Sequence, residues 1–139
     1  MSETENCVFC KIVAGEIPSR KVDEDELSFS FLDIEPFHRG HTLVIPKRHS
    51  ESLISDPPAL GELAPAIDRV SRMLVQKLGA EGLNLLTSAG SVAGQEVFHF
   101  HVHLVPRYPS AAGLADFLTS KAPATAEELD AVQQELTGS

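Results

Sequence analysis

The sequence lacks several features that large classes of protein require. Two cysteines in 139 residues cannot build the disulfide framework of a small secreted domain, and they favour a reducing, cytoplasmic location. No apolar run approaches the roughly 20 residues that cross a bilayer. The N-terminal stretch MSETENCVFC has neither the basic nor the apolar part of a signal peptide. A secreted or membrane-spanning protein is therefore not expected.

Positive charge is also scarce. Eleven Lys and Arg face 20 Asp and Glu, which gives a formal charge of −9. Nucleic-acid polymers and anionic membranes reward clustered Lys and Arg, so neither is expected as the main partner. A small anion such as a mononucleotide stays open, because one pocket can present donors locally. With 42% apolar residues, the chain is expected to form one globular domain with a sizeable core.

Hydrophobic patterning predicts an α+β fold with a mainly antiparallel sheet. A long helix is expected from an N-cap at Asp56 to Gly79, with a kink or a delayed start at Pro65. Four segments have the alternation or the short apolar run of a strand, the last of them closed by Pro106: residues 27–34, 40–49, 83–88 and 97–105.

Shorter helices are expected near the two ends of the chain. Residues 11–17 have an amphipathic pattern that ends near Pro18. Thr125 and Glu128 match a capping box that precedes apolar residues at helical spacing, which predicts a short helix at about 126–137. Residues 89–96 contain glycine and are expected to form a loop.

Half of the six histidines lie in the stretch FHFHVHL, residues 98–104. On a strand, His99, His101 and His103 share one face, about 6.5–7 Å apart, and the apolar residues between them face a core. Three interpretations compete: a polar solvated face, a metal site, and nucleophilic catalysis by a neutral imidazole. A solvated face would more naturally mix Lys, Glu and Thr, which disfavours the first.

These histidines resemble the signature of the histidine triad (HIT) superfamily, and roughly residues 6–108 resemble its bacterial Hint-like branch. HFHVHLV matches His-φ-His-φ-His-φ-φ, where φ is apolar. The blocks CVFCKIVAGEIP, FLDIEP, GHTLVIPKRH and GQEVFHFHVHLVPR match in order, so the domain is expected over 1–108 and a C-terminal tail over 109–139. The resemblance implies a sheet of about five strands with one long and one short helix. It also implies a homodimer, with the long helix and a strand at the two-fold interface.

The resemblance implies a hydrolase or transferase that acts at the α-phosphate of a purine nucleotide, with a phosphoramidate or adenylate as substrate. His101 would attack phosphorus while its other ring nitrogen donates to a backbone carbonyl near His99. His103 would donate to a phosphate oxygen, and His41 would relay a proton to the leaving group. No catalytic metal is required. The alternatives are a dinucleoside polyphosphate hydrolase, a nucleotide-binding module with little turnover, and a metalloenzyme with zinc on the triad.

Further residues match the family's nucleotide pocket. Asp33 would accept hydrogen bonds from the ribose hydroxyls. Ser88 stands where many members have Asn, and Glu96 stands where some have Ser, which leaves substrate preference open. The purine wall would consist of Val8, Phe9, Ile12, Phe31, Leu32 and Ile34, and the phosphate loop would contribute Ser88, Gly94, Gln95 and Glu96.

Cys7 and Cys10 form C-x-x-C, which is half of a tetrahedral zinc site. The resemblance supplies His49 and His99 as the other half of a structural zinc site. Such a site would tie the N-terminal segment to the strand before His101. The alternative is a pair of free thiols. A redox role is disfavoured because the βαβ pattern around a redox C-x-x-C is missing.

Overall fold

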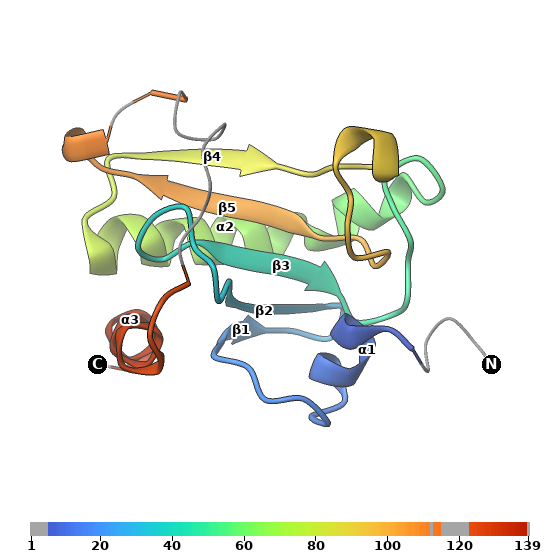
Figure 1. Cartoon of the computed structure of the whole chain (residues 1–139), viewed down its shortest axis with the longest axis horizontal. Helices are drawn as coiled ribbons and strands as arrows, with labels where there is room; N and C mark the ends of the chain where they lie inside the picture. The colour runs from blue at the N-terminus through green and yellow to red at the C-terminus, as the bar shows by residue number, and fades with distance from the viewer. Residues whose placement is uncertain (1–5, 112, 115–122, 139) are drawn as a thin grey trace.

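A computed structural model describes residues 6–111, 113–114 and 123–138 (Figure 1). Its five-stranded antiparallel sheet has the order β1-β2-β3-β5-β4 and confirms the expected α+β fold. Parts of the predicted C-terminal tail, residues 112, 115–122 and 139, lie outside the described residues, as does the start of the N-terminus. The strands are β1 (Lys21–Glu24), β2 (Ser28–Leu32), β3 (Thr42–Pro46), β4 (Gly82–Leu86) and β5 (Val102–Arg107). Strand β1 was not predicted.

Helices lie on both sides of this sheet. The described residues form α1 (Val8–Val13), α2 (Pro58–Leu78) and α3 (Ala126–Thr137), with short 3₁₀ turns at Ser91–Ala93 and Pro109–Ala111. Helix α2 runs along the back of the sheet in Figure 1. Phe100, Val102 and Leu104 face it and form the main core with α2, as the sequence predicted. On the other face, α1 packs on Phe31, Leu43 and Ile45, which form the α1 core. Among the described residues, no helix is both long and apolar enough to span a bilayer.

Helix α2 follows its predicted spacing but differs at its start. Pro57 occupies the N-cap position without a side-chain hydrogen bond. The prediction of an Asp56 cap was wrong, because the Asp56 carboxylate binds Arg48 and Ser50 instead. Pro65 lies inside the continuous helix on its exposed side, so a delayed start was also wrong. The helix ends at Gly79, whose φ of 73° is left-handed.

The histidine strand begins later than its pattern suggests. The β5 ladder starts at Val102, not at residue 97, and it includes Pro106. Before it, Phe100 N donates to the Ser50 carbonyl at 2.6 Å, which diverts the chain from the sheet toward the segment after β3. Pro106 is tolerated because the pairing of β3 with β5 ends at Leu104, so no neighbour on that side needs its missing N–H. Phe98 does not join the apolar face; it is 44% exposed.

Helix α1 begins earlier than predicted and ends well before Pro18. Cys7 is its N-cap, and the Cys7 sulfur accepts the backbone N–H of Cys10. Gly15, with φ of 81°, turns the chain away in place of the expected stop at Pro18. The six-residue helix therefore contains Cys10 and begins beside Cys7.

Helix α3 confirms the predicted capping box. Thr125 accepts the Glu128 N–H, and the Glu128 carboxylate accepts the Thr125 N–H. Leu129, Val132 and Leu136 are buried in the main core. Figure 1 shows α3 end-on, beside β1 and α2. The described part of the tail thus shares the core of the domain.

Candidate active site and metal cluster

The three histidines lie on the face of the sheet that carries α1. His103 is in register with Leu43 of β3, an α1-core residue, and with Leu86 of β4. His99 is 0% exposed and His101 is 8% exposed, so the interpretation as a solvated face was wrong. The Phe9 ring of α1 meets the His101 and His99 rings edge-on at 5.2 and 5.9 Å. Helix α1 therefore packs against the histidine strand.

One ring nitrogen of His101 is fixed by a backbone hydrogen bond. Its Nδ1 lies 2.7 Å from the backbone carbonyl oxygen of His99. A carbonyl can only accept, so Nδ1 carries the hydrogen and the neutral ring keeps a lone pair on Nε2. This is the bond that the sequence led us to expect. In addition, Thr87 Oγ1 donates to the His101 carbonyl at 2.7 Å and ties it to the end of β4.

The proton positions of His41 and His103 follow from a backbone donor. Phe37 N–H donates to His41 Nδ1 at 3.1 Å, so Nδ1 holds no hydrogen and Nε2 carries it. His41 Nε2 lies 2.9 Å from His103 Nδ1 and donates to it. The neutral His103 ring then carries its hydrogen on Nε2. Its second nitrogen is thus a donor, as a contact to a phosphate oxygen requires.

Asp33 lies beside this pair. Its Oδ2 is 3.6 Å from His41 Nε2, and its Oδ1 accepts the Glu35 N–H at 2.8 Å. The backbone N–H of Asp33 donates to the His41 carbonyl at 2.9 Å, which closes the loop between β2 and β3. The Asp33 side chain is 13% exposed. The loop therefore brings a negative charge next to His41.

The four residues of the expected zinc site come together. Ligand atoms of Cys7, Cys10, His49 and His99 all lie within 4.8 Å of one another. The distances are 3.3 Å for Cys7 Sγ to His99 Nδ1, 3.3 Å for Cys10 Sγ to His49 Nδ1, and 3.5 Å for Cys10 Sγ to His99 Nδ1. In a tetrahedron with ordinary zinc bond lengths, sulfur and nitrogen ligands stand about 3.5 Å apart. The cluster fits a tetrahedral ion.

Hydrogen bonding and burial keep the His99 ring in the neutral form that binds metal ions. His99 Nε2 donates to the Pro46 carbonyl at 2.8 Å, which leaves the Nδ1 lone pair facing the two sulfurs. Burial lowers the pKa of His99 to about 4, so this ring is neutral at physiological pH. Burial, and then the neighbouring Cys7, raise the pKa of the Cys10 thiol to about 12. A bound cation would reverse that preference, because coordinated thiols are deprotonated.

A second cluster, Asp33, His41 and His103, also lies within metal-ligand distance. Its hydrogen bonds argue against a metal there, because His41 Nε2 carries a hydrogen for as long as Phe37 N–H occupies Nδ1. Nor do the three triad histidines converge on one ion. His99 Nδ1 faces the cysteines, whereas His101 Nδ1 donates to a carbonyl and His103 Nδ1 accepts from His41. These contacts weigh against a metalloenzyme with zinc on the triad.

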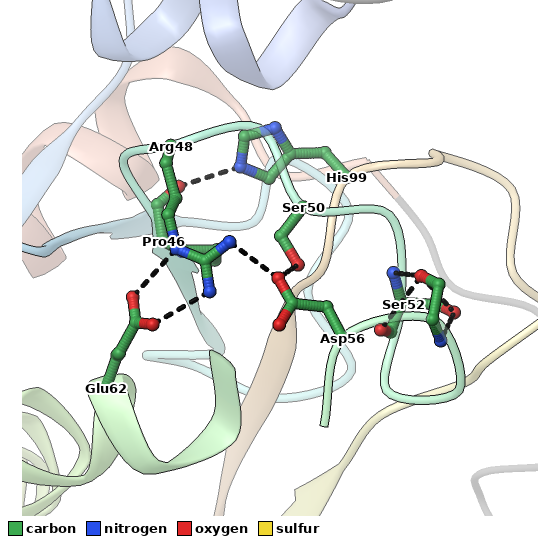
Figure 2. Close-up of polar contacts among 8 residues, drawn as sticks. Pro46, Arg48, Ser50, Ser52, Asp56, Glu62 and His99 are labelled. Carbon is green, nitrogen blue, oxygen red and sulfur yellow. Dashed lines mark hydrogen bonds and ion pairs between the residues drawn. The ribbon is translucent and has the colours of Figure 1, made fainter. Parts of the chain in front are cut away.

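The segment that carries His49 is fixed to α2. Figure 2 shows the Arg48 guanidinium binding both carboxylate oxygens of Glu62, at 3.0 and 2.8 Å, and Asp56 at 2.6 Å. Ser50 Oγ also donates to Asp56 at 2.8 Å. Because His49 lies between Arg48 and Ser50, this network limits the positions that the His49 ring can adopt.

The residues expected to form the purine wall separate into three groups. Phe9, Ile12 and Phe31 meet in the α1 core, and the Phe9 and Phe31 rings contact edge-on at 5.5 Å. Leu32 does not belong to this wall, because alternation along β2 turns it into the main core. Ile34 is 64% exposed and Val8 is 38% exposed. The aromatic part of the wall thus adjoins His101.

The loop before the histidines is braced by Gln95. Its Oε1 accepts the Gly90 N–H, and its Nε2 donates to the carbonyls of Glu51 and Val97. Both amide hydrogens are engaged, so this side chain would have to break a bond to reach a phosphate. Ser88 Oγ lies close to Gly94, 4.0 Å from where a Cβ would stand. Glu96 is exposed and lines a surface pocket on the metal side, with Cys7 and His49.

Some residues of the site had no signal in the sequence. Phe37 sets the His41 tautomer through its backbone N–H, and its ring stacks on His41 with centroids 5.5 Å apart. Thr87 holds the His101 backbone. Neither residue lies in a motif with chemistry of its own, and both contacts depend on folded loops.

A five-stranded antiparallel sheet with alternating histidines beside α1 defines the histidine triad class of proteins. The chain belongs to the HIT family, whose domain matches residues 14–110. It is 46% identical over 110 residues to Protein hit of Bacillus subtilis, and the matched region covers 78% of this chain and 76% of that protein. It is 40% identical over 121 residues to adenosine 5′-monophosphoramidase HNT1 of Candida albicans, with 82% and 78% covered. A zinc-bound histidine triad family protein from Mycobacterium smegmatis superposes with a TM-score of 0.78 at 38% identity, with 96% and 94% covered.

Proposed function

We propose that this protein hydrolyses purine nucleotides at the α-phosphate, cleaving phosphoramidates or related adenylates through a nucleotidyl-histidine intermediate. The observation that carries the proposal is the hydrogen bond from His101 Nδ1 to the His99 carbonyl, which leaves an Nε2 lone pair. The similarity to an adenosine 5′-monophosphoramidase supports the same reaction class. The proposed substrate is a purine mononucleotide conjugate.

With neutral rings, these hydrogen bonds support a two-step displacement. His101 Nε2 attacks phosphorus, an N–P bond forms, and the bond to the leaving nitrogen breaks as that nitrogen takes a proton from solvent. The ring is then a phosphorylated imidazolium, from which water displaces the histidine, releasing the nucleotide and returning the proton. His103 Nε2–H stabilises charge on a phosphate oxygen during both steps.

The hydrogen bonds favour a different role for His41 from the expected proton relay. A second ring hydrogen on His41 would displace the Phe37 N–H from Nδ1. His41 instead keeps His103 in the tautomer that donates from Nε2. Asp33, the first residue of the same loop, is proposed to accept hydrogen bonds from the ribose hydroxyls. Phe9 and Phe31 are proposed to pack against the purine.

We also propose that Cys7, Cys10, His49 and His99 hold a structural zinc ion. The sulfur–nitrogen distances and the His99 hydrogen bond to Pro46 support it. When bound, the ion would neutralise two thiolates and join α1 to the chain just before His101. The reduced thiols that such a site needs agree with the cytoplasmic location expected from the sequence.

The purified protein is expected to release AMP from adenosine 5′-phosphoramidate. A dinucleoside polyphosphate containing the same base, offered at equal concentration, is expected to react more slowly. Chromatographic product analysis separates the two activities. Tight AMP binding without turnover of either substrate would contradict the proposal and favour a binding module. Faster cleavage of the polyphosphate would reassign the substrate.

The homodimer expected from the sequence finds support in an apolar edge. Strand β4 lies at the end of the sheet, and its Leu85 is 52% exposed. Val75 of α2 is 46% exposed. Edge strands with exposed apolar residues are ready to pair with another chain. We propose that β4 and α2 form the two-fold interface.

Leu85→Lys is therefore expected to convert a dimer into monomers in light scattering coupled to gel filtration. Leu27→Lys is a matched control, because Leu27 is 51% exposed but lies in the turn between β1 and β2. The control is expected to stay dimeric. Monomers in the unchanged protein, or dissociation by both variants alike, would contradict this interface.

A further inference from the structure

The C-terminal helix lies against the loop that carries His41. This His41 loop, residues 33–41, connects β2 to β3 and ends at His41, whose ring is hydrogen-bonded to His103. Ala124 N, just before α3, donates to the Ile34 carbonyl at 3.1 Å. Arg39 forms an ion pair with Glu135 of α3. Helix α3 therefore binds the loop near both of its ends, beside Asp33 and beside His41.

The helix is itself firmly placed. Leu129, Val132 and Leu136 are buried in the main core. On its other side, Asp130 accepts from Arg20 Nε at 3.0 Å, and Gln133 Nε2 donates to the Lys21 carbonyl at 2.9 Å. These contacts fix α3 to the start of β1. The helix can therefore serve as a support for the His41 loop.

The loop needs such support because it is not packed tightly against the helix. A cavity of about 370 Å³ lies between them, with Asp33, Phe37 and His41 on the loop side and Leu129 and Val132 on the helix side. Side chains beside a cavity lose packing contacts that would otherwise restrict them. The polar contacts at Ala124 and Arg39 therefore contribute to the restraint, together with the hydrogen bond from Tyr108 Oη to the Arg39 carbonyl at 2.8 Å.

A shift of this loop would reach the reacting atoms through a short chain of bonds. His41 N donates to the His38 carbonyl at 3.0 Å, and Phe37 N donates to the His41 ring. The His41 ring in turn sets which nitrogen of His103 carries the hydrogen. If Phe37 N–H leaves Nδ1, the tautomers of both rings are no longer determined.

We propose that α3 is a positioning helix for the active centre: through Ala124 and Glu135 it holds the His41 loop, and with it the His41–His103 tautomers. The proposal rests on the proposed function, since it names a determinant of the same reaction. It assigns a role to α3, the described helix of the C-terminal tail.

Glu135→Gln and Arg39→Gln are expected to lower kcat about threefold to tenfold with little change in KM. Both side chains are 45% exposed, so the loss of this pair leaves the fold nearly as stable. The charge reversal Arg39→Glu with Glu135→Arg is expected to restore kcat. Arg72→Gln is the matched control, because it also breaks an exposed ion pair, with Asp68, but within α2.

Ala124→Pro tests the second contact by removing the N–H that reaches Ile34. Ala126→Pro is its control: it adds the same ring at the first position of α3, where proline is favoured. Only Ala124→Pro is expected to lower kcat. Nitrogen-15 chemical shifts of the histidine rings give a readout besides activity. In the impaired variants, the His41 ring is expected to populate both tautomers, with its hydrogen on Nε2 in one and on Nδ1 in the other.

Equal kcat in Glu135→Gln, Ala124→Pro and their controls would overturn the positioning role. The positioning role would also be overturned if kcat fell in proportion to the melting temperature of each variant and the charge-reversed pair did not restore it. If the unchanged protein hydrolyses no nucleotide, the proposed function fails. The ring shifts then still decide the positioning proposal: unaltered His41 tautomers in the variants refute it.

Discussion

His101→Ala is expected to lower the rate of AMP release by roughly 10⁴-fold or more, because it removes the atom that forms the bond to phosphorus. AMP binding should change little, since Phe9, Phe31 and Asp33 are untouched. Initial rates with adenosine 5′-phosphoramidate measure the first effect, and calorimetric titration with AMP measures the second. A variant that keeps even a tenth of the activity would show that another group attacks.

His103→Ala is the graded comparison for that experiment. It leaves the nucleophile in place and removes a donor to the phosphate, so a loss of about 10²–10³-fold is expected. Quenching a single turnover in alkaline denaturant, which preserves a phosphorus–nitrogen bond, should trap a nucleotide on the peptide that contains residue 101. The adduct should form slowly with His103→Ala and never with His101→Ala. Rapid turnover without an adduct would contradict the covalent route.

The alternation of histidines predicted one face of a strand, and the register of His103 between Leu43 and Leu86 agrees with it. The sequence could not show that two of these rings are buried, because burial comes from α1 packing across them. Nor could it show the full set of protonation states. They depend on the Pro46 carbonyl and the Phe37 N–H, which residue spacing does not reveal. Only the hydrogen bond from the His101 ring to the backbone carbonyl of His99 could be anticipated.

One local signal failed because residues outside the local turn competed for the same group. Asp56 has the form of an N-cap, but Arg48 and Ser50 take its carboxylate, and the helix begins without a side-chain cap. Contact of Gln95 with the phosphate stays a prediction, and the structure adds that its amide also holds the loop. By contrast, the capping box at Thr125 and Glu128 closes on itself and was predicted correctly. Interactions that are complete within one turn can be predicted from the sequence, whereas competition from residues outside that turn cannot.

Loss of the metal cluster is expected to have the largest effect on stability. Cys10→Ser should reduce bound zinc from about one ion per chain to nearly none and lower the melting temperature by about 10 °C or more. The reason lies in α1, whose six residues are too few for an isolated helix to be stable in water. Without an ion to join Cys7 and Cys10 to His49 and His99, that segment depends on the α1 core and on weak thiol–imidazole contacts. Elemental analysis and thermal unfolding under reducing conditions measure both effects.

The same variant should also weaken nucleotide recognition, because Phe9 lies between the two cysteines and contacts both His101 and Phe31. KM for the phosphoramidate should rise more than kcat falls. Lys11→Ser is the matched control: it changes the neighbouring residue of α1 without removing a ligand. Cys10→His, which supplies a nitrogen ligand, should regain part of the bound zinc and part of the stability. If Cys10→Ser proved as stable as Lys11→Ser, or if the unchanged protein held no zinc after dialysis, α1 would owe its position to packing alone.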